Sequence, residues 1–426
     1  MTMSTHLPFA RAPRLPRGLA AITFGILCGV TFTAASAVAD EDIDDVEPEP
    51  ATQPRRAEPA SKGEGDDADD AGADAGEPGG GASRGHRPGG GKASKAEPSP
   101  LRIGGRVFAR LEAADTDATD WTGQFTLASA RLGVSYRWKD RLRVKAVLEA
   151  AGKVAVRDAF IELAAGSGVD VRAGRFKGPV SAIERASAWV LPTIDRGAIA
   201  DVLEDGIGLT GRRDGIEVRF SGGKRRPRFS AVLSQSVATT GDDPARPLAD
   251  GAGVSAALRG ELPLCQGITL GVTGSNREVN YVADVARFWA GGVDAEIDLG
   301  AAGLGLRLWA DALVGQSHLA AASATDPTTF VAGQLVAGWR LGGADKGKRY
   351  LEPYLLGAYL NPDTGHRRDH LTDLTVGVAG GRWKRWRVQA QVSLVSTWSK
   401  RPAALGGFGV DVDDRMAASL QLGAAF

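Results

Sequence analysis

The sequence predicts an all-β protein, a transmembrane antiparallel β-barrel of about 16 strands preceded by a signal peptide and a disordered acidic segment. First, apolar and polar residues alternate in segments of roughly ten residues, the length that a tilted membrane-spanning strand needs. Second, no apolar run after Thr33 is long enough for a spanning helix, so a membrane location requires a closed ring of paired strands. Third, the chain ends at Phe426 in another alternating segment.

Residues 1–39 are predicted to be a secretory signal peptide. They have a basic start, an apolar centre over 19–33 and a small-x-small cleavage pattern at Ala37-Val38-Ala39. The apolar centre is shorter than the roughly 20 residues that span a bilayer, which disfavours a transmembrane anchor. Cleavage after Ala39 would leave Cys265 as the one cysteine of the mature chain, so no intramolecular disulfide is expected.

Residues 40–100 are predicted to form a disordered, acidic and Gly/Pro-rich periplasmic arm. They contain 16 acidic and 7 basic residues and show no periodicity. Such a segment cannot bury enough apolar surface to offset the entropy cost of ordering it. A solvated spacer is favoured over a metal-binding or peptide-binding tail. Residues 101–426, the predicted barrel, carry a net charge of +6.

The alternation within 101–426 assigns one face of each strand to lipid and the other to the lumen. In the first segment Leu101, Ile103 and Val107 share a face, and three arginines share the other. A soluble β-sandwich also alternates. The membrane is favoured because charges are almost confined to one face and because aromatic residues lie near segment ends. The aromatic residues assigned to lipid girdles are Trp138, Trp289, Trp339, Tyr350, Trp383, Trp386 and Trp398, whereas Trp309 is expected to point inward.

The segment that ends at Phe426 resembles the closing strand of bacterial outer-membrane barrels, whose terminal aromatic residue is read by the insertion machinery. Together with the signal peptide, this resemblance implies the cell outer membrane of a Gram-negative bacterium. The expected partners are therefore the lipid bilayer and, through Phe426, the insertion machinery.

A stretch of about thirty residues, at about 177–206, interrupts the alternation and is too long for an idle turn. In a wide barrel, a loop of this length is predicted to fold inward and narrow the lumen. The candidate constriction residues on it are Lys177, Glu184, Arg185 and Arg196.

Residues 174–209 also carry a family resemblance. Gly174-Arg175-Phe176-Lys177-Gly178-Pro179, followed by Glu184, Ser187, Thr193-Ile194-Asp195-Arg196 and Asp205-Gly206-Ile207-Gly208-Leu209, resembles a stretch of the phosphate-selective porin O and P family. The resemblance implies a sixteen-stranded homotrimeric channel with inward loops and rows of arginine and lysine that guide anions. Asp195 replaces the family's usual glutamate, and no lysine cluster marks a phosphate preference, so the solute stays open.

The candidate anion path rests on arginines that recur along one face. Charges inside a water-filled barrel are focused by its low-dielectric wall and set the sign of ion selectivity. Arg102, Arg106 and Arg110 are spaced by about 13 Å along one strand. The remaining candidates, on the next two segments, are Arg131, Arg143 and Lys145. The alternative is that these bases pair with Glu112, Glu149, Asp158 and Glu162 and only brace the barrel.

No enzyme is expected. There is no nucleophile-elbow motif, and His366 and His370 have zinc-like spacing but follow a turn and lack the glutamate of the zinc motif. No cofactor, metal or nucleic acid is expected either. The sequence therefore predicts a porin for passive diffusion of small anionic solutes into the periplasm, phosphate or polyphosphate among them. The alternative is a non-conducting structural barrel that anchors the periplasmic arm.

Overall fold

The computed structural model describes residues 100–115, 121–139, 141–152, 154–223, 226–235, 253–280, 285–317, 327–343, 347–365, 370–398 and 414–426. The predicted signal peptide, the predicted arm before Pro100, and His366 lie outside these residues.

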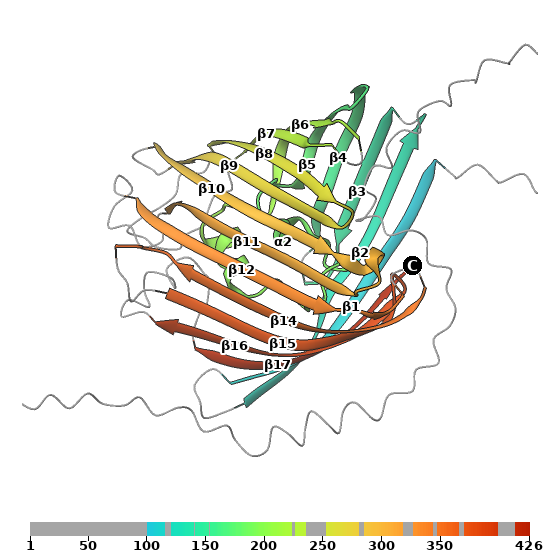
Figure 1. Cartoon of the computed structure of the whole chain (residues 1–426), viewed down its shortest axis with the longest axis vertical. Helices are drawn as coiled ribbons and strands as arrows, with labels where there is room; N and C mark the ends of the chain where they lie inside the picture. Colours follow the sequence, from blue (N-terminus) through green and yellow to red (C-terminus); the bar gives the residue numbers. More distant parts are fainter. Residues whose placement is uncertain are drawn as a thin grey trace, which may run out of the picture. The chain divides into compact units, whose positions relative to one another are not determined.

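The described strands form one antiparallel ring (Figure 1). They are β1 (Leu101–Asp115), β2 (Trp121–Trp138), β3 (Leu142–Glu149), β4 (Ala155–Gly166), β5 (Val169–Lys177), β6 (Arg212–Ser221), β7 (Arg228–Gln235), β8 (Val254–Cys265), β9 (Ile268–Asn280), β10 (Val285–Asp298), β11 (Leu306–Ser317), β12 (Thr328–Trp339), β13 (Leu341–Gly342), β14 (Arg349–Asn361), β15 (His370–Arg382), β16 (Trp386–Trp398) and β17 (Arg415–Ala425). Because β1 pairs with both β2 and β17, the ring is closed. The two-residue β13 continues β12 along their common neighbour β14, so the predicted sixteen-stranded barrel is confirmed.

The alternation sorts side chains between the outside and the lumen as predicted. On β1, Leu101, Ile103 and Val107 are 40–55% exposed, whereas Arg106 is 3% exposed. On β2, a β-bulge opposite Phe108 and Ala109 shifts the register by one residue. A bulge of one residue moves all later side chains of a strand to the opposite face.

The aromatic residues divide between lipid and lumen differently from the prediction. Four of them are exposed on the outer surface: Trp138, Trp289, Trp339 and Trp386. The girdle assignment is wrong for Tyr350 and Trp383, which are buried in one cluster with Tyr354. The guanidinium of Arg340 lies 3.8 Å from the centre of the Trp383 ring. Tyr350 alternates in phase with buried Glu352, so its side chain faces inward, as Trp309 does.

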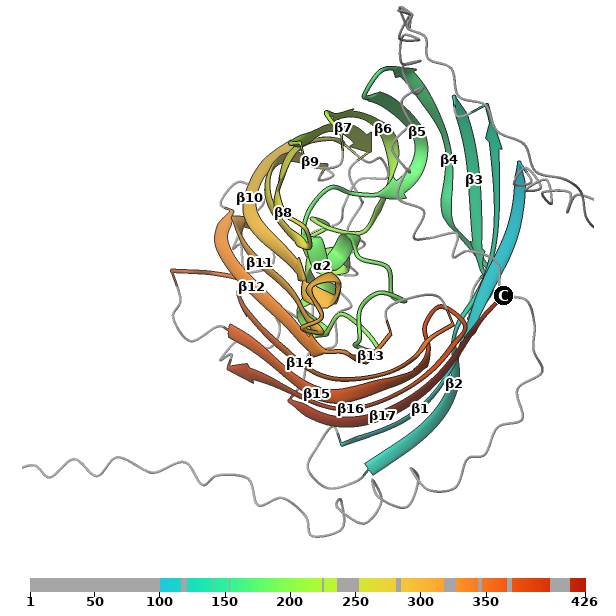
Figure 2. The ribbon, with the colours of Figure 1, turned by 45° about the vertical axis from the view of Figure 1, so that its right-hand side comes forward.

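Short helices occupy the connection between β5 and β6. They are α2 (Ala182–Arg185), α3 (Ala198–Asp201) and the π-helix η1 (Val202–Gly206), while a 3-10 helix, η2 (Leu299–Ala302), follows β10. Figure 2 shows α2 inside the ring of strands. Among the described residues, no helix has the length and apolar character that a membrane crossing requires.

A pair of substitutions on β17 tests the register. Leu420 pairs with exposed Leu111, whereas Ser419 pairs with Glu112 on the inner face. Leu420→Arg should cost about 2–4 kcal/mol because it places a charge on the lipid face near the midplane. Ser419→Arg should be tolerated because its charge faces the lumen. The folded fraction, measured by heat-modifiable gel mobility after refolding into lipid, should fall only for Leu420→Arg. Equal folded fractions would contradict this register.

Candidate functional site

The segment 178–211, called here the inner loop, packs its apolar side chains against the barrel wall. Ile199, Leu203 and Ile207 are fully buried in one cluster with wall residues such as Phe330 and Leu360. Ile183 and Leu191 lie in a second cluster with Trp309 and Leu356. An irregular loop gains stability from such burial at roughly 25 cal/mol per Å² of apolar surface. The inner loop therefore lies against β10–β15 rather than in open water.

Wall side chains also satisfy the backbone carbonyls of the inner loop. Irregular backbone leaves carbonyls without partners, and a guanidinium offers five donors in a planar fork. Arg387 on β16 donates to the carbonyls of Ala188 at 2.7 Å and Leu191 at 3.2 Å. Gln389 donates to those of Pro192 and Thr193 at 2.6 and 2.9 Å. Further donors to loop carbonyls are Arg259 to Pro179, Arg277 to Ile207 and Arg307 to Val190.

Three wall groups accept hydrogen bonds from the loop. Asp373 Oδ2 accepts from the Ala198 N–H at 2.8 Å, and Gln391 Oε1 accepts from the Ile194 N–H at 3.1 Å. Asp311 accepts from the Ser181 hydroxyl. These contacts fasten the loop to β8, β9, β11, β15 and β16. Sequence analysis missed the wall residues that make these contacts. Alternation places their side chains on the inner face of the barrel but does not show which segment they contact.

The predicted residues of β1 lie on the inner face, and two of them contact the loop. Arg106 Nη1 lies 3.5 Å from the Ser187 hydroxyl, and Arg110 Nη1 lies 3.7 Å from Asp195 Oδ2. Arg110 also lies 3.7 Å from Glu112. Arg102, near the start of β1, is partly buried. The structure therefore brings Arg106 and Arg110 together with the inner loop.

The predicted bases of β2 and β3 belong to a lattice of ion pairs across strands. Arg131 bonds to Glu149 at 2.6 Å, and Lys145 lies 3.4 Å from Asp158. Arg143 lies 5.9 Å from the centre of the Phe160 ring. The lattice continues through the contacts of Arg212 with Asp158, Arg172 with Glu162, and Arg219 with Glu162. Arg131 and Lys145 thus make the cross-strand contacts that the bracing alternative describes.

Of the predicted constriction residues, Lys177 ends β5 just before the inner loop, and Glu184, Arg185 and Arg196 lie within the loop. Lys177 donates to the carbonyls of Arg185 and Ala186, at 3.3 and 2.9 Å, and Arg185 pairs with Glu261 on β8. Arg196 donates to the carbonyls of Ile183 and Ala186, and its Nε lies 3.9 Å from Glu184. The contacts of Lys177 and Arg196 fix the shape of the loop, whereas the contact of Arg185 joins the loop to β8.

Glu184 is the buried carboxyl of this group. Burial raises the pKa of Glu184 to about 7, although nearby Arg196 and Lys177 act in the opposite direction. Its Oε2 faces Arg196, while Oε1 has no hydrogen-bond partner in the protein. Glu184 can therefore change its charge near neutral pH.

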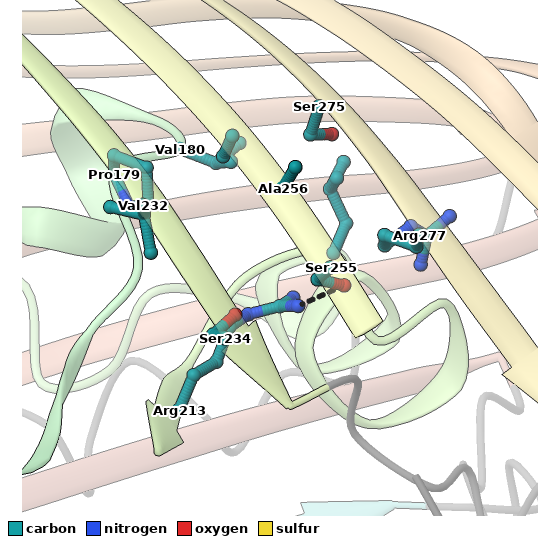
Figure 3. A pocket seen from close by; sticks show the side chains of 11 residues that line it. Pro179, Val180, Arg213, Val232, Ser234, Ser255, Ala256, Ser275 and Arg277 are labelled. Atoms are coloured by element: carbon teal, nitrogen blue, oxygen red, sulfur yellow. Dashed lines mark hydrogen bonds between the residues drawn. The ribbon is translucent and has the colours of Figure 1, made fainter. Parts of the chain in front are cut away.

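A small cavity lies between the two ends of the inner loop and β6–β9 (Figure 3). It is lined by Pro179, Val180, Val232 and Ala256, and Arg213 at its edge donates to the Ser255 hydroxyl at 3.3 Å. The cavity is a packing space behind the loop ends. Among the residues that the structure describes, no three His, Cys, Asp or Glu side chains are grouped to hold a metal ion.

Several solved porins share this fold. The anion-selective porin of Comamonas acidovorans matches with 12% identity and a TM-score of 0.54, over 76% of this chain and 99% of that one. The outer-membrane channel DcaP of Acinetobacter baumannii gives the same identity and TM-score over 76% and 97%. OmpF of Salmonella typhi, in complex with daunomycin, matches with 13% identity and a TM-score of 0.51 over 76% and 97%. No curated protein matches the sequence.

The sequence also matches a family profile, described as phosphate-selective porin O and P, over residues 103–264. This range runs from within β1 to within β8 and includes the whole inner loop, on which the predicted resemblance rests. The match and the porin fold together confirm that resemblance and the predicted location. The chain is an outer-membrane β-barrel of a Gram-negative bacterium and resembles, over residues 103–264, the phosphate-selective porin O and P family.

Proposed function

We propose that this porin passes small anionic solutes into the periplasm by passive diffusion, without catalysis. The observation that carries the proposal is the position of the inner loop, which is fastened to β8, β9, β11, β15 and β16. Figure 2 shows α2 on the side of β8–β12, away from β3 and β4. We therefore assign the path for solutes to the side of the loop that faces the opposite wall, β2–β6.

The charges of that opposite wall favour anions. Its inner basic side chains include Arg131, Arg143, Lys145, Arg157, Arg172, Arg212 and Arg219. The acids facing them are Glu149, Asp158, Glu162, Asp170 and Glu217. A local excess of positive charge inside a low-dielectric wall enriches anions and repels cations. We assign the same role to Arg102, Arg106 and Arg110 at the edge of the path.

The proposal extends to the loop and to assembly. We assign the narrowing of the path to Lys177, at the end of β5, and to Glu184, Arg185 and Arg196 of the inner loop. The fold shared with an anion-selective porin supports the sign of the selectivity. The family resemblance supports phosphate or polyphosphate as solutes and a homotrimer. The alternating closing strand β17, which ends next to Phe426, supports recognition of Phe426 by the insertion machinery.

Recording in planar lipid bilayers tests the proposal. The purified barrel should insert in discrete conductance steps, and its reversal potential in a potassium chloride gradient should show preference for chloride. Correctly folded protein that inserts without conductance would favour the structural barrel instead. Conductance with preference for potassium would contradict the anion path.

A triple substitution tests the role of the three arginines of β1 in the anion preference. Changing Arg102, Arg106 and Arg110 to Gln removes three positive charges and leaves the inner face polar, so the barrel should still fold. The anion preference should fall because the field along β1 weakens. The difference from wild type should shrink at 1 M salt, where the screening length is about 3 Å. An unchanged preference in folded protein would mean that these arginines only brace the loop.

A further inference from the structure

The strand pairing places one side chain of β4 on the face opposite to the one that alternation predicts. Ala159, Ile161 and Leu163 alternate along the outer face, and the latter two are half exposed. Strict alternation would therefore place Arg157 outside as well. However, the pairing of β3 with β4 shifts between Val147 and Leu148, which leaves Arg157 as the extra residue of a bulge.

The bulge directs Arg157 into the lumen. Its Nε lies 3.8 Å from Glu149, which is an inner-face acid of β3. It also interacts electrostatically with Glu204 and Arg196 of the inner loop. Bulges commonly re-aim a side chain in this way. Arg157 therefore faces the inner loop across the proposed path.

Arg157 is also held less closely by ion pairs than the neighbouring bases of this wall. Its partner Glu149 already accepts bonds from Arg131 at 2.6 Å and from the Ala130 N–H at 2.7 Å. The Arg157 Nε is buried without a hydrogen-bond partner in the protein. Its side chain is 38% exposed, against 6–22% for the paired bases Arg131, Lys145, Arg172, Arg212 and Arg219.

We propose that Arg157 is the principal anion-contacting residue of the path and determines its charge selectivity. A partly exposed guanidinium can present two parallel N–H donors to a carboxylate or phosphate oxygen pair. The ligand class is thus a small oxyanion that contacts Arg157 as it passes the inner loop. This inference rests on the proposed function.

Arg175 on β5 offers a matched control for charge and exposure. It pairs with Asp214 at 3.1 Å, and its side chain is 39% exposed. Asp214 shares the outer face of β6 with half-exposed Ile216, so this arginine lies outside the lumen. Arg175→Gln removes the same charge as Arg157→Gln, one strand away, without altering the path.

Reversal potentials in a potassium chloride gradient give the test. Arg157→Gln should lower the anion-to-cation permeability ratio by about threefold or more, because one kT of potential changes a local ion concentration by that factor. Arg157→Lys should retain most of the preference, and Arg175→Gln should retain all of it. An anion-selective wild type whose preference survives Arg157→Gln would overturn this inference alone. A wild type without anion preference would overturn the proposed function as well.

A measurement on the wild-type barrel covers the case in which Arg157→Gln does not fold. Hydroxyphenylglyoxal, an arginine reagent small enough to enter a channel, should modify Arg157 faster than Arg131 and Arg172. Peptide mass spectrometry gives the three rates. Modification of Arg157 at a rate no higher than that of Arg131 would overturn the inference, since it would show that Arg157 is not the accessible arginine of this wall.

Discussion

Replacing Arg387 by Met is expected to release the centre of the inner loop and raise the single-channel conductance. Arg387 holds the carbonyls of Ala188 and Leu191, and its guanidinium lies 4.9 Å from the centre of the Trp189 ring. Each buried carbonyl that loses its donor costs about 1–3 kcal/mol. Because these contacts join the loop to β16, their loss should let the loop move within the lumen.

Two measurements test whether the inner loop is released. In Arg387→Met, the open-channel current should become larger and noisier, and trypsin should cut the folded barrel faster at Arg185 or Arg196 in the loop. Arg382→Met is the control, because Arg382 is exposed at the end of the neighbouring strand β15, opposite Trp386. Wild-type conductance and cleavage in Arg387→Met would show that the apolar contacts alone hold the loop.

Loop docking is expected to weaken as the pH rises, and Glu184→Gln should remove much of that dependence. Burial raises the pKa of Glu184 from 4.5 to about 7, so the docked loop binds a proton that an undocked loop releases. The stabilisation from this proton is complete below about pH 4.5 and is lost as the pH rises through about 7. Its full size is on the order of 3 kcal/mol.

Open-channel noise at pH 5 and pH 8 measures this effect. Wild-type noise should rise with pH, whereas Glu184→Gln should stay quiet at pH 8 because its side chain is neutral at both values. Asp214→Asn, on the outer face, is the control. Equal pH dependence in wild type and Glu184→Gln would exclude Glu184 as the titrating group.

The sequence by itself determined the ring of strands and the polarity of most faces. Alternation with a period of two is a local property, so the outward position of Leu101 and the inward position of Arg106 follow from their neighbours in the chain. The length of the segment at 177–206 likewise predicted an inward loop, since a connection of that length is rarely idle.

Tertiary structure alone decided which wall holds the inner loop and which bases remain accessible. Arg387 and Ala188 meet across 199 residues of chain, a contact that no local pattern encodes. Its place in a bulge reverses the face of Arg157, and closer donors to Glu149 leave the Arg157 side chain partly exposed. Local periodicity fixes which way a side chain points, whereas its partner depends on packing between segments far apart in the sequence.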